Sequence, residues 1–227
     1  MISFRQHLQV HFKLFFKRPL DVLAPALFSI ILATLLNFNL GSLDGENKEY
    51  VFELIQVLVV FLSLELCLAN SFAAENEDKA FLRLRVHSKS VYSWFAAKWL
   101  FAFMQTLCIC FIASLAIGFF SNSMPAFLRW QFFVATILIC GGLASIGILL
   151  KSLSIESRLS RIVFSLLYYP LASPALLAYS NITELYRLSA FSELNSWLSL
   201  LSGMTLLYIA SGCFLFGELN KPASEAN

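Results

Sequence analysis

Long apolar runs separated by short polar segments make up most of the chain. A helix needs about 20 consecutive apolar residues to cross a bilayer. Runs of about that length lie near residues 22–40, 51–73, 94–120, 127–150, 162–180 and 194–217. A soluble domain does not repeat such runs, so the pattern predicts an all-α, polytopic membrane protein with six transmembrane helices.

The first 21 residues carry a different pattern. Apolar residues recur there at helical spacing with basic residues between them; they are Phe4, Leu8, Phe12 and Phe15, with Arg5, Lys13 and Lys17. This pattern is typical of a helix that lies in the membrane interface, with its basic side toward anionic headgroups. We therefore expect an N-terminal amphipathic interfacial helix over 1–21, a six-span domain over 22–217 and a polar cytoplasmic tail over 218–227.

Two prolines, Pro170 and Pro174, fall inside the fifth run. Proline lacks a backbone donor and breaks a helix in water, but in a membrane protein neighbouring groups can satisfy the freed carbonyls. We therefore keep this run as a predicted transmembrane helix.

The distribution of charge predicts the orientation. The chain is 59% hydrophobic with a net charge of +2, but lysine and arginine cluster before the first run, between the second and third, and between the fourth and fifth. Because positive residues mark the cytoplasmic side, both termini are expected in the cytoplasm.

The sequence lacks the motifs of common active sites, including G-x-x-x-x-G-K-[ST], H-E-x-x-H, C-x-x-C-H and G-x-S-x-G. His7 and His11 are four residues apart but have no third ligand nearby, so we expect them at the interfacial surface. The five cysteines lie in apolar runs without a C-x-x-C pair and are expected to act as small buried residues. We predict no enzyme activity, no catalytic, cofactor or metal site, and no nucleic-acid partner.

Ionisable residues inside spans are costly and mark candidate functional positions. Glu65 lies deep in the second run, and Lys98 lies about one turn into the third, from where it could snorkel to the inner interface. Glu65 is either a helix-packing residue bonded to a neighbour or part of a transport pathway or partner contact. The small residues of "CGGLASIG" (140–147) predict a close helix-packing face.

A charged segment between the second and third runs predicts a short cytoplasmic helix. Glu75, Glu77 and Asp78 suit its first turn, where carboxylates favour the positive end of the helix dipole. Phe81 and Leu84 are three residues apart and share one face. Such a helix is either a plain solvated connector or a coupling helix that docks its apolar anchors in a soluble partner.

This segment resembles the signature of ABC-2-type permeases. The matching positions are Phe72, Glu75, Asp78, Phe81, Leu84, Ser88, Ser90 and Lys98. Within that superfamily the chain is most similar to the haem exporter permeases of the bacterial cytochrome c maturation system. That likeness rests on the start "FKRPLDVLAPALF" and on Pro170 and Pro174 in "YYPLASPALLAYS".

The resemblance implies a multi-pass permease of the bacterial inner membrane that carries no cofactor itself. A separate cytosolic ABC ATPase would bind ATP and would dock on the coupling helix. Three further partners would come from the same system: a haem-handling membrane protein, a small membrane protein and a periplasmic haem chaperone. ATP hydrolysis would be coupled to release of the haem-loaded chaperone, and a direct role in haem export stays open. The alternatives are an ABC-2-type permease for another cargo (a lipid-linked glycan, drug or peptide) and a non-transporting membrane scaffold.

Overall fold

The computed structural model describes residues 4–17, 19–39, 55–68, 91–121, 130–156 and 161–219. Within these ranges the fold is entirely helical apart from one short turn, which confirms the all-α class. The helices are α1 (Phe4–Lys17), α2 (Pro19–Asn39), a helix over Ile55–Leu68, α5 (Val91–Ser121), α6 (Trp130–Glu156), α7 (Arg161–Arg187) and α8 (Phe191–Leu219).

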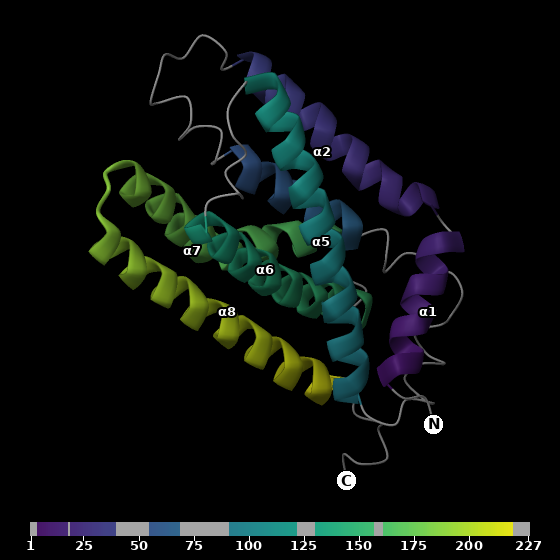
Figure 1. Ribbon diagram of the computed structural model, residues 1–227. Coiled ribbons are helices and arrows are strands. Elements are labelled where there is room, and N and C mark those ends of the chain that lie inside the picture. The colour runs from purple at the N-terminus through teal and green to yellow at the C-terminus, as the bar shows by residue number, and fades with distance from the viewer. Residues whose placement is uncertain are drawn as a thin grey trace.

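Helix α6 is the central element of the bundle. Every residue from Ile139 to Ser152 is buried, and α6 packs against α5, α7 and α8. Helices α1 and α2 lie along the other side of α5 (Figure 1). A helix that is apolar all round is expected at the centre of a membrane protein, since no face has to meet water.

Small residues bring α6 and α8 close together. Gly142 lies against Thr205 and Tyr208, and Gly212 lies against Ser145. Side chains then donate to backbone carbonyls of the facing helix: Ser145 Oγ to Tyr208 O at 2.9 Å and Thr205 Oγ1 to Leu138 O at 3.0 Å. The packing face predicted for residues 140–147 is therefore confirmed.

Three helices are long and apolar enough to cross a membrane among the described residues: Tyr92–Phe119, Trp130–Leu153 and Phe191–Glu218. Two shorter apolar helices, Leu23–Leu36 and Ile55–Leu68, accompany them. This agrees with a polytopic membrane protein, while the count of six spans stays a prediction. Large aliphatic side chains on the outer faces, such as Leu206 and Leu207 of α8, suit contact with lipid.

Helix α7 continues through both prolines. Pro174 has no N–H to offer the carbonyl of Pro170, and Ser173 Oγ donates to that carbonyl instead, at 2.9 Å. Tyr208 of α8 donates its hydroxyl to Leu171 O at 2.9 Å. The expectation that neighbouring groups satisfy the freed carbonyls is thus met at Pro170 O, the carbonyl freed by Pro174.

A tight turn reverses the chain between α7 and α8. Ser189 N–H donates to Tyr186 O and Ala190 N–H to Leu185 O, both at 3.0 Å, and Ser189 has a φ of 55°. These two bonds form a Schellman motif, in which serine occupies the left-handed position that glycine usually takes. The turn makes α7 and α8 adjacent helices.

The first helix, Phe4–Lys17, lies within the predicted range 1–21. The expected surface position is wrong for His11, which is 4% exposed and stacks on Phe101 of α5 with ring centroids 5.6 Å apart. Phe12 meets the same ring edge-on at 5.8 Å. The imidazole is an aromatic packing group here because α1 lies along α5, a contact that the pattern of α1 alone does not reveal.

Candidate functional site

Glu65 lies between the Ile55–Leu68 helix and α7, where it accepts a hydrogen bond. The hydroxyl of Tyr169 donates to Glu65 Oε2 at 3.2 Å. Glu65 is half-buried and Tyr169 is exposed on the face of α7. A carboxylate at this depth needs such a donor, because lipid offers none.

Two adjacent tyrosines of α7 hold the Ile55–Leu68 helix. The Tyr168 ring stacks on Phe61 with centroids 5.0 Å apart, and Tyr169 meets the same ring edge-on at 5.2 Å. The buried hydroxyl of Tyr168 donates to Leu143 O of α6 at 3.4 Å. The segment directly before Pro170 therefore connects α7, α6 and the helix that carries Glu65.

Lys98 of α5 is only 2% exposed and is among the largest fully buried side chains of the described residues. Its side chain packs inside the bundle, and whether its ammonium group reaches the interface stays a prediction. On either side of it along α5, Trp94 packs against Phe216 of α8, and Trp99 donates Nε1–H to Gly141 O at 2.9 Å. Lys98 thus lies in the tightly packed part of the bundle, at the start of α5.

Buried polar side chains connect α5, α6, α7 and the Ile55–Leu68 helix. Gln56 Nε2 donates to Cys110 Sγ at 3.2 Å, and Cys110 and Cys140 line the same small void beside this amide. Thr136 Oγ1 lies 3.3 Å from Tyr179 Oη. Polar contacts of this kind hold membrane helices together because few competing partners exist in lipid.

Helix α8 joins this arrangement at the start of α5. Phe216 packs against Trp94 and Phe95 with ring centroids 5.0 and 5.3 Å apart, and Gly217 lies against Tyr92. The first residues of α5 that the structure describes are therefore fixed to the last turns of α8 (Figure 1).

The comparisons with known proteins identify the family. The family model described as CcmB protein matches residues 3–218, nearly the whole chain. The chain belongs to the CcmB family. A search of curated proteins finds no significant individual match.

CcmB proteins are permeases of the haem export system for cytochrome c biogenesis. The chain is accordingly a multi-pass membrane protein and the permease of an ABC transporter, which works with an ATPase partner and other Ccm components. The CcmB family is not itself an enzyme family.

The predicted CcmB site residues are brought together only in part. Glu65 lies four residues after Phe61, on which the tyrosines next to Pro170 pack. Pro170 and Pro174 are exposed on α7. The coupling residues Glu75, Glu77, Asp78, Phe81 and Leu84 lie outside the described residues, so their role stays a prediction.

Sequence reasoning missed the partners of the predicted residues. The sequence signal for the first partner is the tyrosine pair in "YYP", directly before Pro170. The signal for the second is Gln56, a polar amide within an apolar run. The pairing of Cys110 with Cys140 had no sequence signal, because the two thiols lie on separate helices. Of the cysteines expected to be buried, Cys108 is exposed. In the part of the chain that the structure describes, no three His, Cys, Asp or Glu side chains gather as a metal site would require.

Proposed function

We propose that this permease couples ATP hydrolysis by a separate cytosolic ATPase to release of the haem-loaded periplasmic chaperone from the haem-handling membrane protein of the same system. A small membrane protein completes the assembly, which lies in the bacterial inner membrane with both termini of this chain in the cytoplasm. The chain itself needs no cofactor for this role, since the ATPase binds ATP and the other components handle haem.

One observation carries the proposal: the two helices that flank the predicted coupling segment in sequence are both anchored in the core of the bundle. The Ile55–Leu68 helix precedes the segment and contacts α7 through Phe61 and Glu65. Helix α5 follows it and contacts α8 through Trp94.

Force applied to residues 72–90 would therefore reach both sides of the bundle through packed side chains. Close-packed interiors transmit displacement because they have few voids to absorb it. The aromatic stack at Phe61 and the hydrogen bond at Glu65 link one flank to α7, whose prolines remove two internal hydrogen bonds and make it the helix most easily bent.

The coupling step needs a docking contact with the ATPase. Phe81 and Leu84 are the proposed apolar anchors, and Glu75, Glu77 and Asp78 set the orientation of the segment on a basic rim of the partner. Buried apolar anchors at interfaces are each worth about 2 kcal/mol or more when truncated to alanine.

Co-purification with the ATPase tests this contact. The variant with Phe81→Ala and Leu84→Ala should lose most of the ATPase from the detergent-solubilised complex. The matched control carries Leu206→Ala and Leu207→Ala, which remove two exposed apolar side chains from α8. Equal recovery of the ATPase with both double variants would show that residues 81 and 84 are not the docking anchors.

A further inference from the structure

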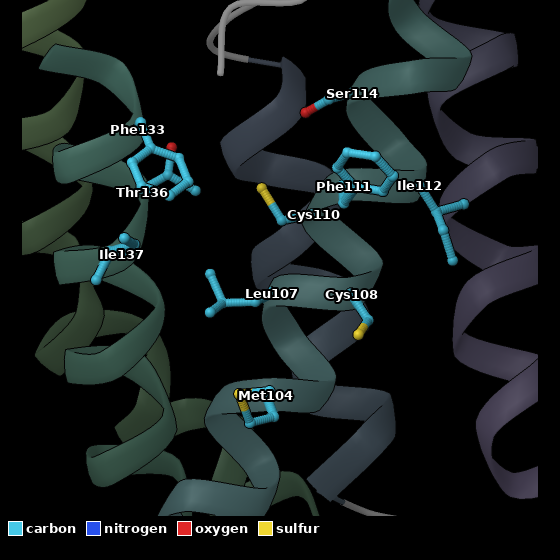
Figure 2. Close-up of a pocket in the computed structure, with 10 residues that line it drawn as sticks. All are labelled: Met104, Leu107, Cys108, Cys110, Phe111, Ile112, Ser114, Phe133, Thr136 and Ile137. Atoms are coloured by element: carbon cyan, nitrogen blue, oxygen red, sulfur yellow. The ribbon is translucent and has the colours of Figure 1, made fainter. Parts of the chain in front are cut away.

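An open cavity of about 450 Å³ is lined by residues of α5 and α6 (Figure 2). Its lining is almost entirely apolar, with Met104 and Phe111 from α5 and Phe133 and Ile137 from α6. Pockets of this size hold small organic ligands. None of the described residues that line it is charged, so a ligand has to be neutral and apolar over most of its surface.

The inner end of the cavity is polar. Ser114 is 2% exposed, its Oγ makes no hydrogen bond of ordinary geometry among the described residues, and the Cys110 thiol is its polar neighbour. Thr136 and Cys110 line the same cavity, and Figure 2 shows all three side chains at the gap between the helices. A buried hydroxyl that lacks a good partner is costly, and a ligand oxygen placed there would satisfy it.

Two thiols lie directly behind this polar end. Cys110 and Cys140 are free and buried, and Gln56 Nε2 donates to Cys110 Sγ at 3.2 Å. Both cysteines line the same small void, together with Gln56 and Thr136. Cys110 lines the open cavity as well as this void, whereas the exposed Cys108 lines the open cavity alone. Cys110 is therefore the thiol through which a ligand in the cavity would reach Cys140.

The geometry points to a redox site: a neutral membrane quinone binds in the α5–α6 cavity and oxidises Cys110 and Cys140 to a disulfide. The two S–H bonds break and one S–S bond forms. The two electrons and two protons pass to the quinone, whose two carbonyl oxygens become the hydroxyls of the quinol. The new bond ties α5 to α6, and reduction by a dithiol restores mobility between them.

A quinone fits these observations better than other membrane ligands. Haem and fatty acids carry carboxylates, for which the described lining of the cavity offers no cation. A quinone presents a carbonyl acceptor for Ser114, a flat ring that suits Phe111 and Phe133, and an apolar tail for the open side. It also supplies the oxidant that the thiol pair requires.

The experiment uses the full chain, reduced and purified into lipid nanodiscs, with decylubiquinone as the probe. Quinol formation is followed by ultraviolet absorbance, and the Cys110–Cys140 disulfide by mass spectrometry of the digest. The wild type should form about one quinol per chain, and Cys110→Ser and Cys140→Ser should each abolish quinol formation. Cys67→Ser and Cys213→Ser are the controls, since neither thiol is among the described residues that line the cavity or the void, and both variants should react like the wild type.

Ser114→Ala separates binding from thiol chemistry. It should raise the quinone concentration for half-maximal oxidation about three- to tenfold, as loss of one hydrogen bond does. Oxidation of Cys110 and Cys140 in this variant by diamide, a small oxidant that needs no binding site, should proceed as in the wild type. A diamide-induced Cys110–Cys140 disulfide without quinol formation from decylubiquinone would overturn the quinone site, and no disulfide with either oxidant would overturn the thiol pair.

Discussion

Tyr169 of α7 donates its hydroxyl to Glu65, which lies 104 residues earlier in the chain, at 3.2 Å. This bond joins the helix that precedes the predicted coupling segment to the helix that holds the two prolines. The edge-on contact of the same tyrosine with Phe61 adds apolar packing to the bond. We regard Glu65 and Tyr169 as the central link between the Ile55–Leu68 helix and α7.

Removing the hydroxyl of Tyr169 tests this link. Tyr169→Phe keeps the ring on Phe61 and leaves Glu65 without its phenolic donor, so maturation of c-type cytochromes in a complementation assay should fall. The free energy of unfolding of this variant should fall by only about 0.6 kcal/mol, the average for a hydrogen bond between membrane helices.

Glu65→Gln should lower maturation in the same assay, because an amide accepts this hydrogen bond less strongly than a carboxylate does. Ser202→Ala on α8, which removes a hydroxyl bonded within its own helix, is the control. Normal maturation of c-type cytochromes in the Glu65→Gln variant would show that the carboxylate of Glu65 is not needed for function.

The close contact of α6 and α8 predicts opposite effects at two glycines of α8. A Cβ at Gly212 would overlap Ser145 Oγ and crowd the Phe95 ring at 3.1 Å, whereas a Cβ at Gly203 meets nothing within 4 Å. Gly212→Ala should therefore lower the free energy of unfolding by about 1–3 kcal/mol. Gly203→Ala should leave it unchanged or raise it by up to about 1 kcal/mol, through helix propensity.

Unfolding of the detergent-solubilised protein in sodium dodecyl sulfate, followed by circular dichroism, measures both variants. If Gly212→Ala were as stable as Gly203→Ala, the α6–α8 packing described here would be wrong.

The hydroxyl of Ser173 and the missing N–H of Pro174 predict a coupled pair of mutations. Ser173→Ala leaves the Pro170 carbonyl without its donor and should destabilise the protein by about 0.5–1.5 kcal/mol. In a Pro174→Ala background the restored backbone N–H takes over that carbonyl, so the same Ser173→Ala change should have almost no effect.

A double-mutant cycle on unfolding free energies isolates this coupling. Additive effects of the two mutations would indicate that Ser173 does not compensate for the proline.

The elements that depend on a local pattern could be predicted from the sequence. The helical spacing of Phe4, Leu8 and Phe12 predicted α1, and the small residues of 140–147 predicted the packing face of α6. Both signals lie within one helix. The glycine and serine residues indicate that another helix packs closely against this face, but they do not indicate which helix it is.

Contacts between helices could not be predicted in the same way. The sequence left the neighbour of Glu65 unnamed, and its hydrogen-bond donor is Tyr169. The relative depth and rotation of two transmembrane helices cannot be read from the residue pattern of either one. Helices α5 and α6 are apolar on all sides, so no periodicity marked the side on which Cys110 meets Cys140. His11 illustrates the same limit, since an imidazole suits an interface and an aromatic stack equally well.

The most direct test of coupling is release of the haem-loaded chaperone from the complete complex reconstituted in nanodiscs, measured together with ATP hydrolysis. We expect release to require ATP and the partner ATPase. Tyr169→Phe should slow release while ATP hydrolysis and ATPase binding stay at wild-type levels. Release at the full rate without the partner ATPase would show that this permease does not couple ATP hydrolysis to release.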